Sequence, residues 1–288
     1  MAVRAELKFE TLEIEVAHRV AVVTLAREKV RNAFNETMIA ELTQAFRALG
    51  GDGEVRAIVL AANGPAFCAG ADLDWMRRMS AYSFDENRRD ALALAVMLRT
   101  IHDCPKPTIA RVQGDAYAGG MGLLAACDVA VAAATAAFCL SETRLGLIPA
   151  TIGPYVVRAM GVNAARRYFL TAEKFDAAEA LRIGLLHEVA PPEGLDARVD
   201  ALLAALSATS AHAVAAAKQL VRDVAGRAID DALMADTAER IAQIRTSDDG
   251  REGIAAFLGK RKPRWIAQTE AEQAARQSAG DVPRRGRA

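Results

Sequence analysis

The stretch that decides the fold is Thr108–Cys127, with the sequence TIARVQGDAYAGGMGLLAAC. Its first five residues are mostly apolar and β-branched, which predicts a buried strand. Gly119, Gly120 and Gly122 then open an apolar helix that we expect to end near Cys127. A strand, a glycine-rich loop and a helix in this order are typical of an α/β fold.

The same order of elements occurs upstream of this stretch. Arg56–Ala61 (RAIVLA) predicts a buried strand that runs into the loop Asn63–Asp72. Asn35 is suited to cap an amphipathic helix from about Glu36 to Leu49, and Asp72 is suited to cap a short helix after the loop. Further strands are expected at 12–16, 20–25, 108–112, 129–132 and 137–140, and a further helix at 84–103.

After about residue 150 the pattern becomes almost wholly helical. Helices are expected near 152–160, 163–170, 176–183, 196–207, 210–224, 229–246 and 248–258, with a short strand around 185–189. The chain is therefore divided into an α/β core at 1–190, a helical region at 191–265 and a polar tail at 266–288. Apolar residues at 228, 229, 232, 233, 241 and 244 fit one helix face, which packs either within the subunit or against another one.

Charge and composition exclude several classes of protein. Lys plus Arg and Asp plus Glu number 36 each, so the formal net charge is zero and no nucleic-acid or anionic-membrane partner is expected. No apolar run approaches the ~20 residues that a membrane span needs. The N-terminus carries no apolar signal region, so we expect a cytoplasmic protein. Cys68, Cys104, Cys127 and Cys139 are irregularly spaced, which favours reduced thiols over metal ligands or disulfides.

Two loops and one carboxylate carry the predicted chemistry. Taken singly, the loops at 66–73 and 112–122 are small-residue connections between a strand and a helix. Taken together, they could direct two amide N–H groups at one oxygen, which is the arrangement of an oxyanion hole. Glu142 stands in a largely apolar stretch, where burial would suit it to proton transfer; pairing with Arg144 or capping of a turn is the alternative.

Three motifs in this order resemble the crotonase superfamily of enoyl-CoA hydratases and isomerases. They are FCAGADL at 67–73, GDAYAGGMGLLAACD at 114–128 and SETRLGLIP at 141–149, within a likeness from about Leu12 to Trp265. The resemblance implies a spiral of repeated ββα units with a helical C-terminal trimerisation part. It also implies an acyl-CoA thioester as substrate without a further cofactor, and a homotrimer or a dimer of trimers.

The resemblance places the catalytic groups residue by residue. The oxyanion amides fall on Ala71 and Gly119, and the second of the two hydratase glutamates falls on Glu142. The first glutamate falls on Gly122, which has no side chain, so the two-glutamate scheme is in doubt. We expect the fold to tolerate Gly122→Glu.

The resemblance also implies contacts to CoA near 27–33 and to the acyl group around the loops. Arg144 could meet a substrate carboxylate, or form a structural ion pair. The residues expected to contact substrate are Lys29, Arg31, Ala33, Ala69, Asp72, Leu73, Gly120 and Arg144.

Three functions stay open at this point. The detailed sequence looks like bacterial methylglutaconyl-CoA hydratases, which favours hydration of a branched or carboxylated 2-enoyl-CoA. A single glutamate would also suffice for an isomerase that shifts a double bond. The alternative of another class is a non-catalytic family member that binds CoA or RNA.

Overall fold

The computed structural model describes residues 8–266 of the chain. Within this range the chain forms two compact units. The core unit runs to Cys104 and continues from Thr108 to Ala201, and the helical unit holds Pro105–Pro107 and the chain from Leu202 onward. The expected polar tail at 266–288 lies outside the described residues, except for its first residue.

A six-stranded sheet forms one layer of the core unit. Its order is β1-β2-β3-β5-β7-β10, and all neighbours are parallel except the hairpin β1–β2. The central strand β3 is apolar along its whole length and buried on both faces, as expected of a parallel strand covered on each side. The strands are β1 (Leu12–Ala17), β2 (Val20–Leu25), β3 (Ala57–Ala62), β5 (Thr108–Val112), β7 (Val129–Ala133) and β10 (Glu188–Ala190).

A second, smaller sheet holds four short strands. They are β4 (Ala66–Cys68), β6 (Asp115–Tyr117), β8 (Ala137–Cys139) and β9 (Phe175–Asp176), in the order β4-β6-β8-β9. The first three run parallel, and β9 pairs antiparallel with β8. The sequence predicted loops at β4 and β6, because three-residue strands are too short to show an alternating pattern.

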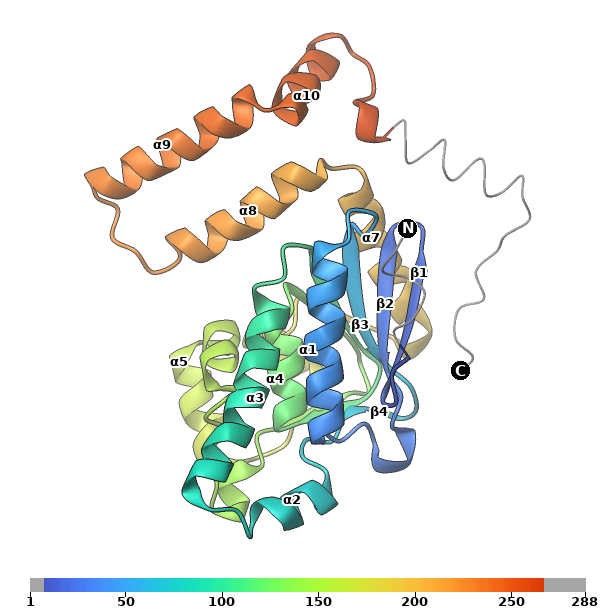
Figure 1. The fold of residues 1–288 in the computed structure, drawn as a ribbon, viewed down its shortest axis with the longest axis vertical. Coiled ribbons are helices and arrows are strands. Elements are labelled where there is room, and N and C mark those ends of the chain that lie inside the picture. The colour runs from blue at the N-terminus through green and yellow to red at the C-terminus, as the bar shows by residue number, and fades with distance from the viewer. Residues whose placement is uncertain (1–7, 267–288) are drawn as a thin grey trace, which may run out of the picture. The chain divides into compact units, whose positions relative to one another are not determined.

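Helices α1, α3, α4 and α5 lie side by side in a second layer, and Figure 1 shows the first three of them next to one another. Asn35 caps α1 by accepting from the Met38 N–H at 2.9 Å, as predicted. The segments predicted at 152–160 and 163–170 form one helix that is interrupted at Gly161, where φ is 76°. The helices are α1 (Glu36–Gly51), α2 (Leu73–Met79), α3 (Phe84–His102), α4 (Gly119–Ala126), α5 (Gly153–Thr171), α6 (Ala177–Arg182) and α7 (Leu195–Ser207), with 3-10 turns at Glu28–Val30, Glu142–Leu145 and Pro192–Gly194.

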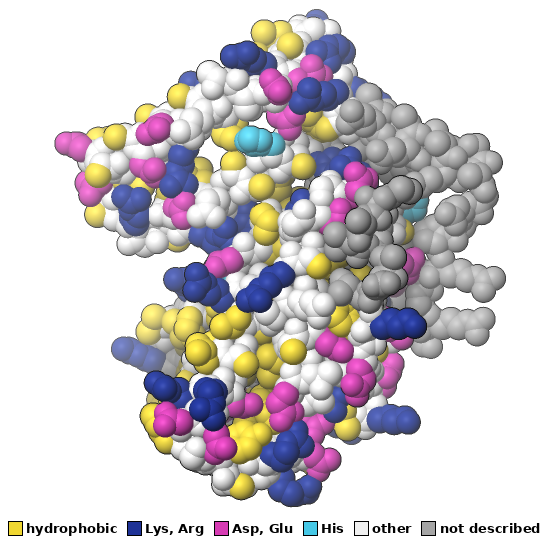
Figure 2. All heavy atoms as spheres, in the orientation of Figure 1, with side chains coloured by type: hydrophobic (Ala, Val, Ile, Leu, Met, Phe, Trp, Pro, Cys, Tyr) yellow, Lys and Arg dark blue, Asp and Glu magenta, His cyan; other side chains and the backbone are white. Residues whose placement is uncertain are grey.

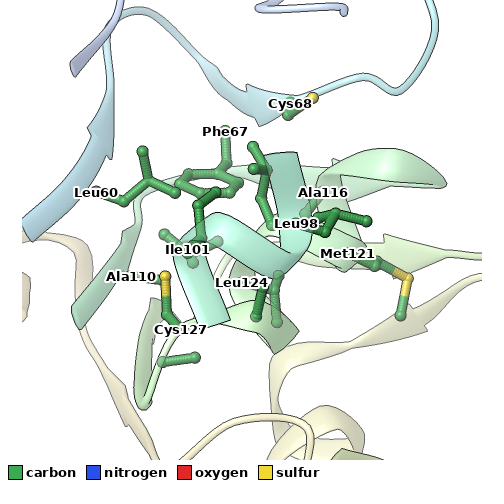
Figure 3. Close-up of a cluster of buried hydrophobic side chains, with 14 of the residues drawn as sticks. Leu60, Phe67, Cys68, Leu98, Ile101, Ala110, Ala116, Met121, Leu124 and Cys127 are labelled. Atoms are coloured by element: carbon green, nitrogen blue, oxygen red, sulfur yellow. The ribbon is translucent and has the colours of Figure 1, made fainter. Parts of the chain in front are cut away.

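The core unit is held by side chains from both sheets and from the helix layer. Figure 3 shows Leu60 of β3, Phe67 of β4, Leu98 of α3 and Met121 of α4 meeting in one cluster. All four are fully buried. The start of α4 is therefore fixed between a strand of each sheet and a long helix, which gives the glycine-rich first turn of α4 a rigid support.

The helical unit contains α8 (Ala211–Val224), α9 (Asp231–Thr246) and α10 (Asp248–Leu258). Of the apolar face expected here, Leu233 is buried, whereas Ile229 and Ile241 are exposed. Phe257 and Leu258 are exposed as well. Between residues 8 and 266 no single helix is both long enough and apolar enough to cross a membrane. The helices Pro192–Ser207 and Ala211–Val224 meet these criteria of length and composition only when they are taken together, as a pair bent by 107°. The predicted α/β class with a helical C-terminal part is confirmed.

Candidate active site

The three motifs singled out in the sequence follow three neighbouring strands of the small sheet. In this sheet β4 pairs in parallel with β6 through Cys68 and Ala116, and β6 pairs in parallel with β8 through Tyr117 and Cys139. Because the carboxyl ends of parallel strands lie at the same edge, the loops after β4, β6 and β8 meet there. This edge brings Ala71, Gly119 and Glu142 to one side of the core unit.

The first candidate amide is that of Ala71. Phe34 forms an isolated parallel bridge with this residue: the Phe34 N–H donates to the Gly70 carbonyl at 2.7 Å, and the Asp72 N–H donates to the Phe34 carbonyl at 2.9 Å. In such a bridge the N–H of the middle residue faces the opposite side of the strand. Accordingly, the Ala71 N–H has no acceptor within residues 8–266.

The second candidate amide is that of Gly119, the first residue of α4. The preceding Ala118 donates its N–H to the Cys139 carbonyl at 2.9 Å and accepts the Met121 N–H at 2.9 Å. The Gly119 N–H itself finds no acceptor in the described part of the chain. Amides at the first turn of a helix have no partner within the helix and carry partial positive charge, which suits them to an anion.

Ala118 has an unusual backbone conformation, with φ of 46° and ψ of −117°. This region is open to glycine and strained for a residue with a Cβ, at a cost of about 1–3 kcal/mol. The conformation sets the plane of the peptide between Ala118 and Gly119, and so the direction of the Gly119 N–H. The strain lies at the group that would bind the substrate oxygen.

Glu142 begins the 3-10 turn that follows β8. Its Oε2 is buried and has no hydrogen-bond partner among residues 8–266. Burial raises the pKa of this carboxyl above its ordinary value of 4.5. The alternative of an ion pair with Arg144 is not observed: Arg144 is exposed and, in the described part of the chain, carries no ion pair. A half-buried carboxylate with one oxygen free of hydrogen bonds in the described structure is suited to accept and return a proton.

Gly122, the position of the first glutamate in the expected two-glutamate scheme, packs directly against Ile152. A Cβ at Gly122 would lie 2.8 Å from the Ile152 Cβ, closer still to its Cγ2, and 3.6 Å from Leu98 Cδ2. The expectation that Gly122→Glu fits the fold is therefore wrong, because a side chain at 122 has no room while Ile152 is present.

The basic residues expected to contact CoA lie on the segment before α1. Lys29 and Arg31 are exposed and form no ion pair with any residue from 8 to 266. The Arg31 carbonyl accepts the Ala69 N–H at 3.0 Å, so this segment lies directly against the first loop. Ala33 is buried, and its carbonyl accepts from the Arg27 guanidinium.

The three other residues predicted to contact substrate, Asp72, Leu73 and Gly120, differ in burial and in their hydrogen-bond partners. The Asp72 carboxylate caps α2 through the N–H groups of Asp74 and Trp75 and pairs with Arg27 at 2.9 Å, so its side chain holds the loop. Arg27 and those N–H groups lower the pKa of Asp72 despite its burial. Leu73 is exposed, and Gly120 packs against the Cys68 carbonyl.

Sequence reasoning missed two residues that shape the site. Phe34 bridges to Ala71, and Asn32 is fully buried, where its amide donates to the carbonyls of Asn63 and Ala66. Asn32 lies in the 27–33 segment that the resemblance assigns to CoA, and Phe34 directly follows it, so this segment was the available signal. Only the fold shows that this segment runs beside the first loop.

The arrangement can stabilise negative charge on a carbonyl oxygen and move a proton beside it. Preorganised amides aimed at a developing oxyanion are often the largest contribution to such catalysis, and loss of one costs about 3 kcal/mol. The four cysteines are buried and form no disulfide, and no group of acidic, His and Cys side chains that could hold a metal is found between residues 8 and 266.

Comparison with known proteins adds independent information. The sequence profile of the family described as enoyl-CoA hydratase/isomerase matches residues 15–268. An enoyl-CoA hydratase of Alternaria alternata is 35% identical over 246 residues, which cover 84% of this chain and 80% of that protein.

Two solved structures are similar over nearly their whole length. One, from Legionella pneumophila, is assigned to the enoyl-CoA hydratase/isomerase (crotonase) group; it is 43% identical, has a TM-score of 0.85, and the match covers 90% of this chain and 100% of that one. The other, an enoyl-CoA hydratase from Shewanella pealeana, is also 43% identical, with a TM-score of 0.87 and coverage of 90% and 97%.

Proposed function

Since the chain belongs to the enoyl-CoA hydratase/isomerase family and has the crotonase fold, we propose that it adds water to the double bond of a 2-enoyl-CoA thioester. The observation that carries this proposal is the half-buried Glu142 carboxylate, whose Oε2 has no hydrogen-bond partner within residues 8–266, at the same sheet edge as two unpaired amides, those of Ala71 and Gly119.

The proposed reaction needs no atoms beyond water and substrate. The thioester oxygen accepts the two amide N–H groups, and the water oxygen bonds to C3 while the C2–C3 π electrons move to the thioester oxygen as an enolate. Glu142 takes one proton from the water. When the enolate collapses, Glu142 returns that proton to C2, so the carboxylate is regenerated. The amides contribute because they bind the enolate more strongly than the neutral carbonyl.

One carboxylate performs both proton transfers in this scheme. Gly122 has no side chain and Ile152 fills the space in front of it. Burial alone accounts for the raised pKa of Glu142, without a neighbouring charge. The raised pKa of Glu142 lies closer to neutral pH than that of an ordinary glutamate. A carboxyl with such a pKa can act first as base and then as acid in one turnover.

Arg144 supports a carboxylated acyl chain, such as that of 3-methylglutaconyl-CoA. It is an exposed cation two residues after Glu142 and has no ion-pair partner within the described range. A guanidinium can bind a carboxylate through two parallel hydrogen bonds. Arg144→Gln should raise KM for a carboxylated substrate and leave KM for crotonyl-CoA unchanged. Arg47→Gln, an exposed arginine on α1, is the control and should change neither.

A second candidate function is favoured by the same single carboxylate. In an isomerase, Glu142 would remove a proton from C2 of a 3-enoyl-CoA and return it to C4, with the enolate held by the same two amides. This reaction requires only one proton-transferring group.

A non-catalytic RNA-binding role has weaker support. RNA binding requires a basic surface, and the face seen in Figure 2 has acidic and basic side chains interspersed. Salt-sensitive retention of RNA without turnover of any acyl-CoA would favour this role.

The deciding experiment is a turnover panel on the purified protein. It compares crotonyl-CoA, 3-methylglutaconyl-CoA and a 3-enoyl-CoA, and follows hydration and double-bond shift separately by chromatography of the products. Hydration of a 2-enoyl-CoA that is lost in Glu142→Gln supports the proposal. Double-bond shift without hydration would establish the isomerase, and an active Glu142→Gln enzyme would remove Glu142 as the base.

We propose further that the chain assembles as a trimer or a dimer of trimers. Support comes from large apolar side chains that the single chain leaves exposed in the helical unit: Ile229 at 88%, Phe257 at 83% and Leu258 at 74%. Light scattering after size exclusion should give three or six times the chain mass, and a monomer at micromolar concentration would refute this assembly.

A further inference from the structure

Phe34 connects the two candidate amides, and neither the proposed chemistry nor the comparisons assign it a role. It lies between the Glu28–Val30 turn and α1 and is 1% exposed. Its main chain bonds the residues on either side of Ala71, as described above, so it fixes the direction in which the Ala71 N–H points.

The side chain of the same residue lies against the second amide. A Cβ added to Gly119 would lie 2.7 Å from Cε2 and 2.9 Å from Cδ2 of the Phe34 ring. The ring edge is thus packed on the Gly119 α-carbon, with no room for a methyl group between them. One residue therefore touches both donor loops, the first through its backbone and the second through its ring.

Phe34 itself is held from both directions along the chain. On one side, the Asn32 side chain donates to the carbonyls of Asn63 and Ala66 and accepts the Arg27 N–H at 2.8 Å. On the other side, Asn35 caps α1. Arg31 and Asn32 both have positive φ, 53° and 54°, and this double turn brings the chain against the first loop.

We propose that Phe34 is a positioning residue that sets the separation of the Ala71 and Gly119 N–H groups. The inference rests on the proposed function, since it assigns to these amides the thioester oxygen. The ring acts as a spacer: it limits how closely Gly119 approaches Phe34, while the backbone bonds hold the first loop to the same residue. Catalysis by such donors depends on position, and a displacement of about 1 Å can cost 100-fold in rate.

Phe34→Leu separates this role from simple core packing. Leucine keeps the two backbone hydrogen bonds and the burial but withdraws the ring edge from Gly119. We expect kcat to fall at least tenfold, with KM for the CoA ester changed less than threefold. The control is Phe46→Leu on α1, because Phe46 is also 1% exposed and belongs to the same core, but is not among the atoms nearest to Gly119. It should lose similar thermal stability and keep kcat.

A spectroscopic measurement reads the amides directly. Butyryl-CoA labelled with ¹³C at the thioester carbonyl is bound to each protein, and the infrared carbonyl stretch is compared with that of free ligand. Wild type and Phe46→Leu should shift the stretch to lower frequency, and Phe34→Leu should lose most of that shift. Phe34→Met, which restores length but not the flat edge, should lie between them and supplies a second variant if Phe34→Leu does not fold.

The outcomes separate this inference from the proposed function. A wild-type protein that binds butyryl-CoA without a carbonyl shift would refute the two-amide pocket itself. A normal shift and a normal kcat in both the Leu and Met variants would refute only the role of Phe34. Equal losses of kcat in Phe34→Leu and Phe46→Leu would reduce Phe34 to a packing residue and overturn the proposal.

Discussion

Gly122→Ala should destabilise the core unit, because Ile152 fills the space that a side chain would need. The new Cβ would lie 2.8 Å from the Ile152 Cβ, against about 3.5–4.0 Å for an optimal carbon pair. To relieve this contact, Ile152 or α4 would have to move by roughly 1 Å. Neither has free space around it, since Ile152 is 2% exposed and Met121, the α4 residue next to Gly122, is fully buried. Overpacking of this kind costs about 1–3 kcal/mol, and we expect the upper half of that range.

The partner substitution tests whether Ile152 is the cause. Ile152→Gly alone should cost about 3–5 kcal/mol through the cavity and the added backbone freedom. In the double variant the nearest remaining atom to the new methyl group is Leu98 Cδ2 at 3.6 Å, which is an ordinary contact. The methyl group then fills part of the cavity left by Ile152. The unfolding free energy lost in the double variant should therefore be about 2 kcal/mol smaller than the sum of the losses in the two single variants.

The assay is urea unfolding followed by Trp75, which is 4% exposed in the core unit, in a Trp265→Phe background. Gly153→Ala is the control, because its Cβ would meet only Phe169 Cε2 at 3.9 Å; it should change the unfolding free energy by less than about 1 kcal/mol. A Gly122→Ala variant within about 0.5 kcal/mol of wild type, or additivity within the same margin, would refute the reasoning.

The remaining predictions concern the charges and the backbone of the site. The kcat/KM of the wild type should fall as the pH drops through a Glu142 pKa that burial holds above 4.5, and a pH profile flat down to the ordinary glutamate pKa would contradict this. Because folding favours the protonated carboxyl, Glu142→Gln should melt above wild type near neutral pH, and this advantage should vanish below a pH of about 4.5. Lys29→Ala/Arg31→Ala should raise KM for an acyl-CoA but not for the acyl-pantetheine, which lacks the nucleotide phosphates; equal rises would exclude a phosphate contact. Ala118→Gly should raise the unfolding free energy by about 1 kcal/mol in urea titrations, and a loss of stability would show that φ of 46° is not strained here.

Long periodic segments and capping residues could be predicted from the sequence. Helix α1 begins after Asn35 and α2 after Asp72, as the preference of their side chains for N-caps indicated. The buried strand β3 was expected within one residue of its observed bounds, because RAIVLA is apolar throughout. These features depend on residues close together in the chain.

The walls of the site could not be predicted in this way. The strands β4 and β6 that deliver its loops have three residues each, and no pattern of period two can show over that length. The contact of Gly122 with Ile152 joins residues of α4 and of the segment before α5, and it depends on packing that no local preference encodes. The resemblance supplied the positions of the amides and of the carboxylate, but it did not predict which side chains pack around them.

The packing of Ile152 against Gly122 also limits the order in which substitutions can occur at these two positions. A carboxylate at 122 cannot be acquired in one step, since it would collide with the isoleucine. Loss of the isoleucine first would leave a hole in the core, so each order of change passes through a damaged intermediate. With this pair in place, the proposed chemistry relies on Glu142 as its one carboxylate, whereas a change of substrate at the proposed Arg144 contact meets no such steric barrier.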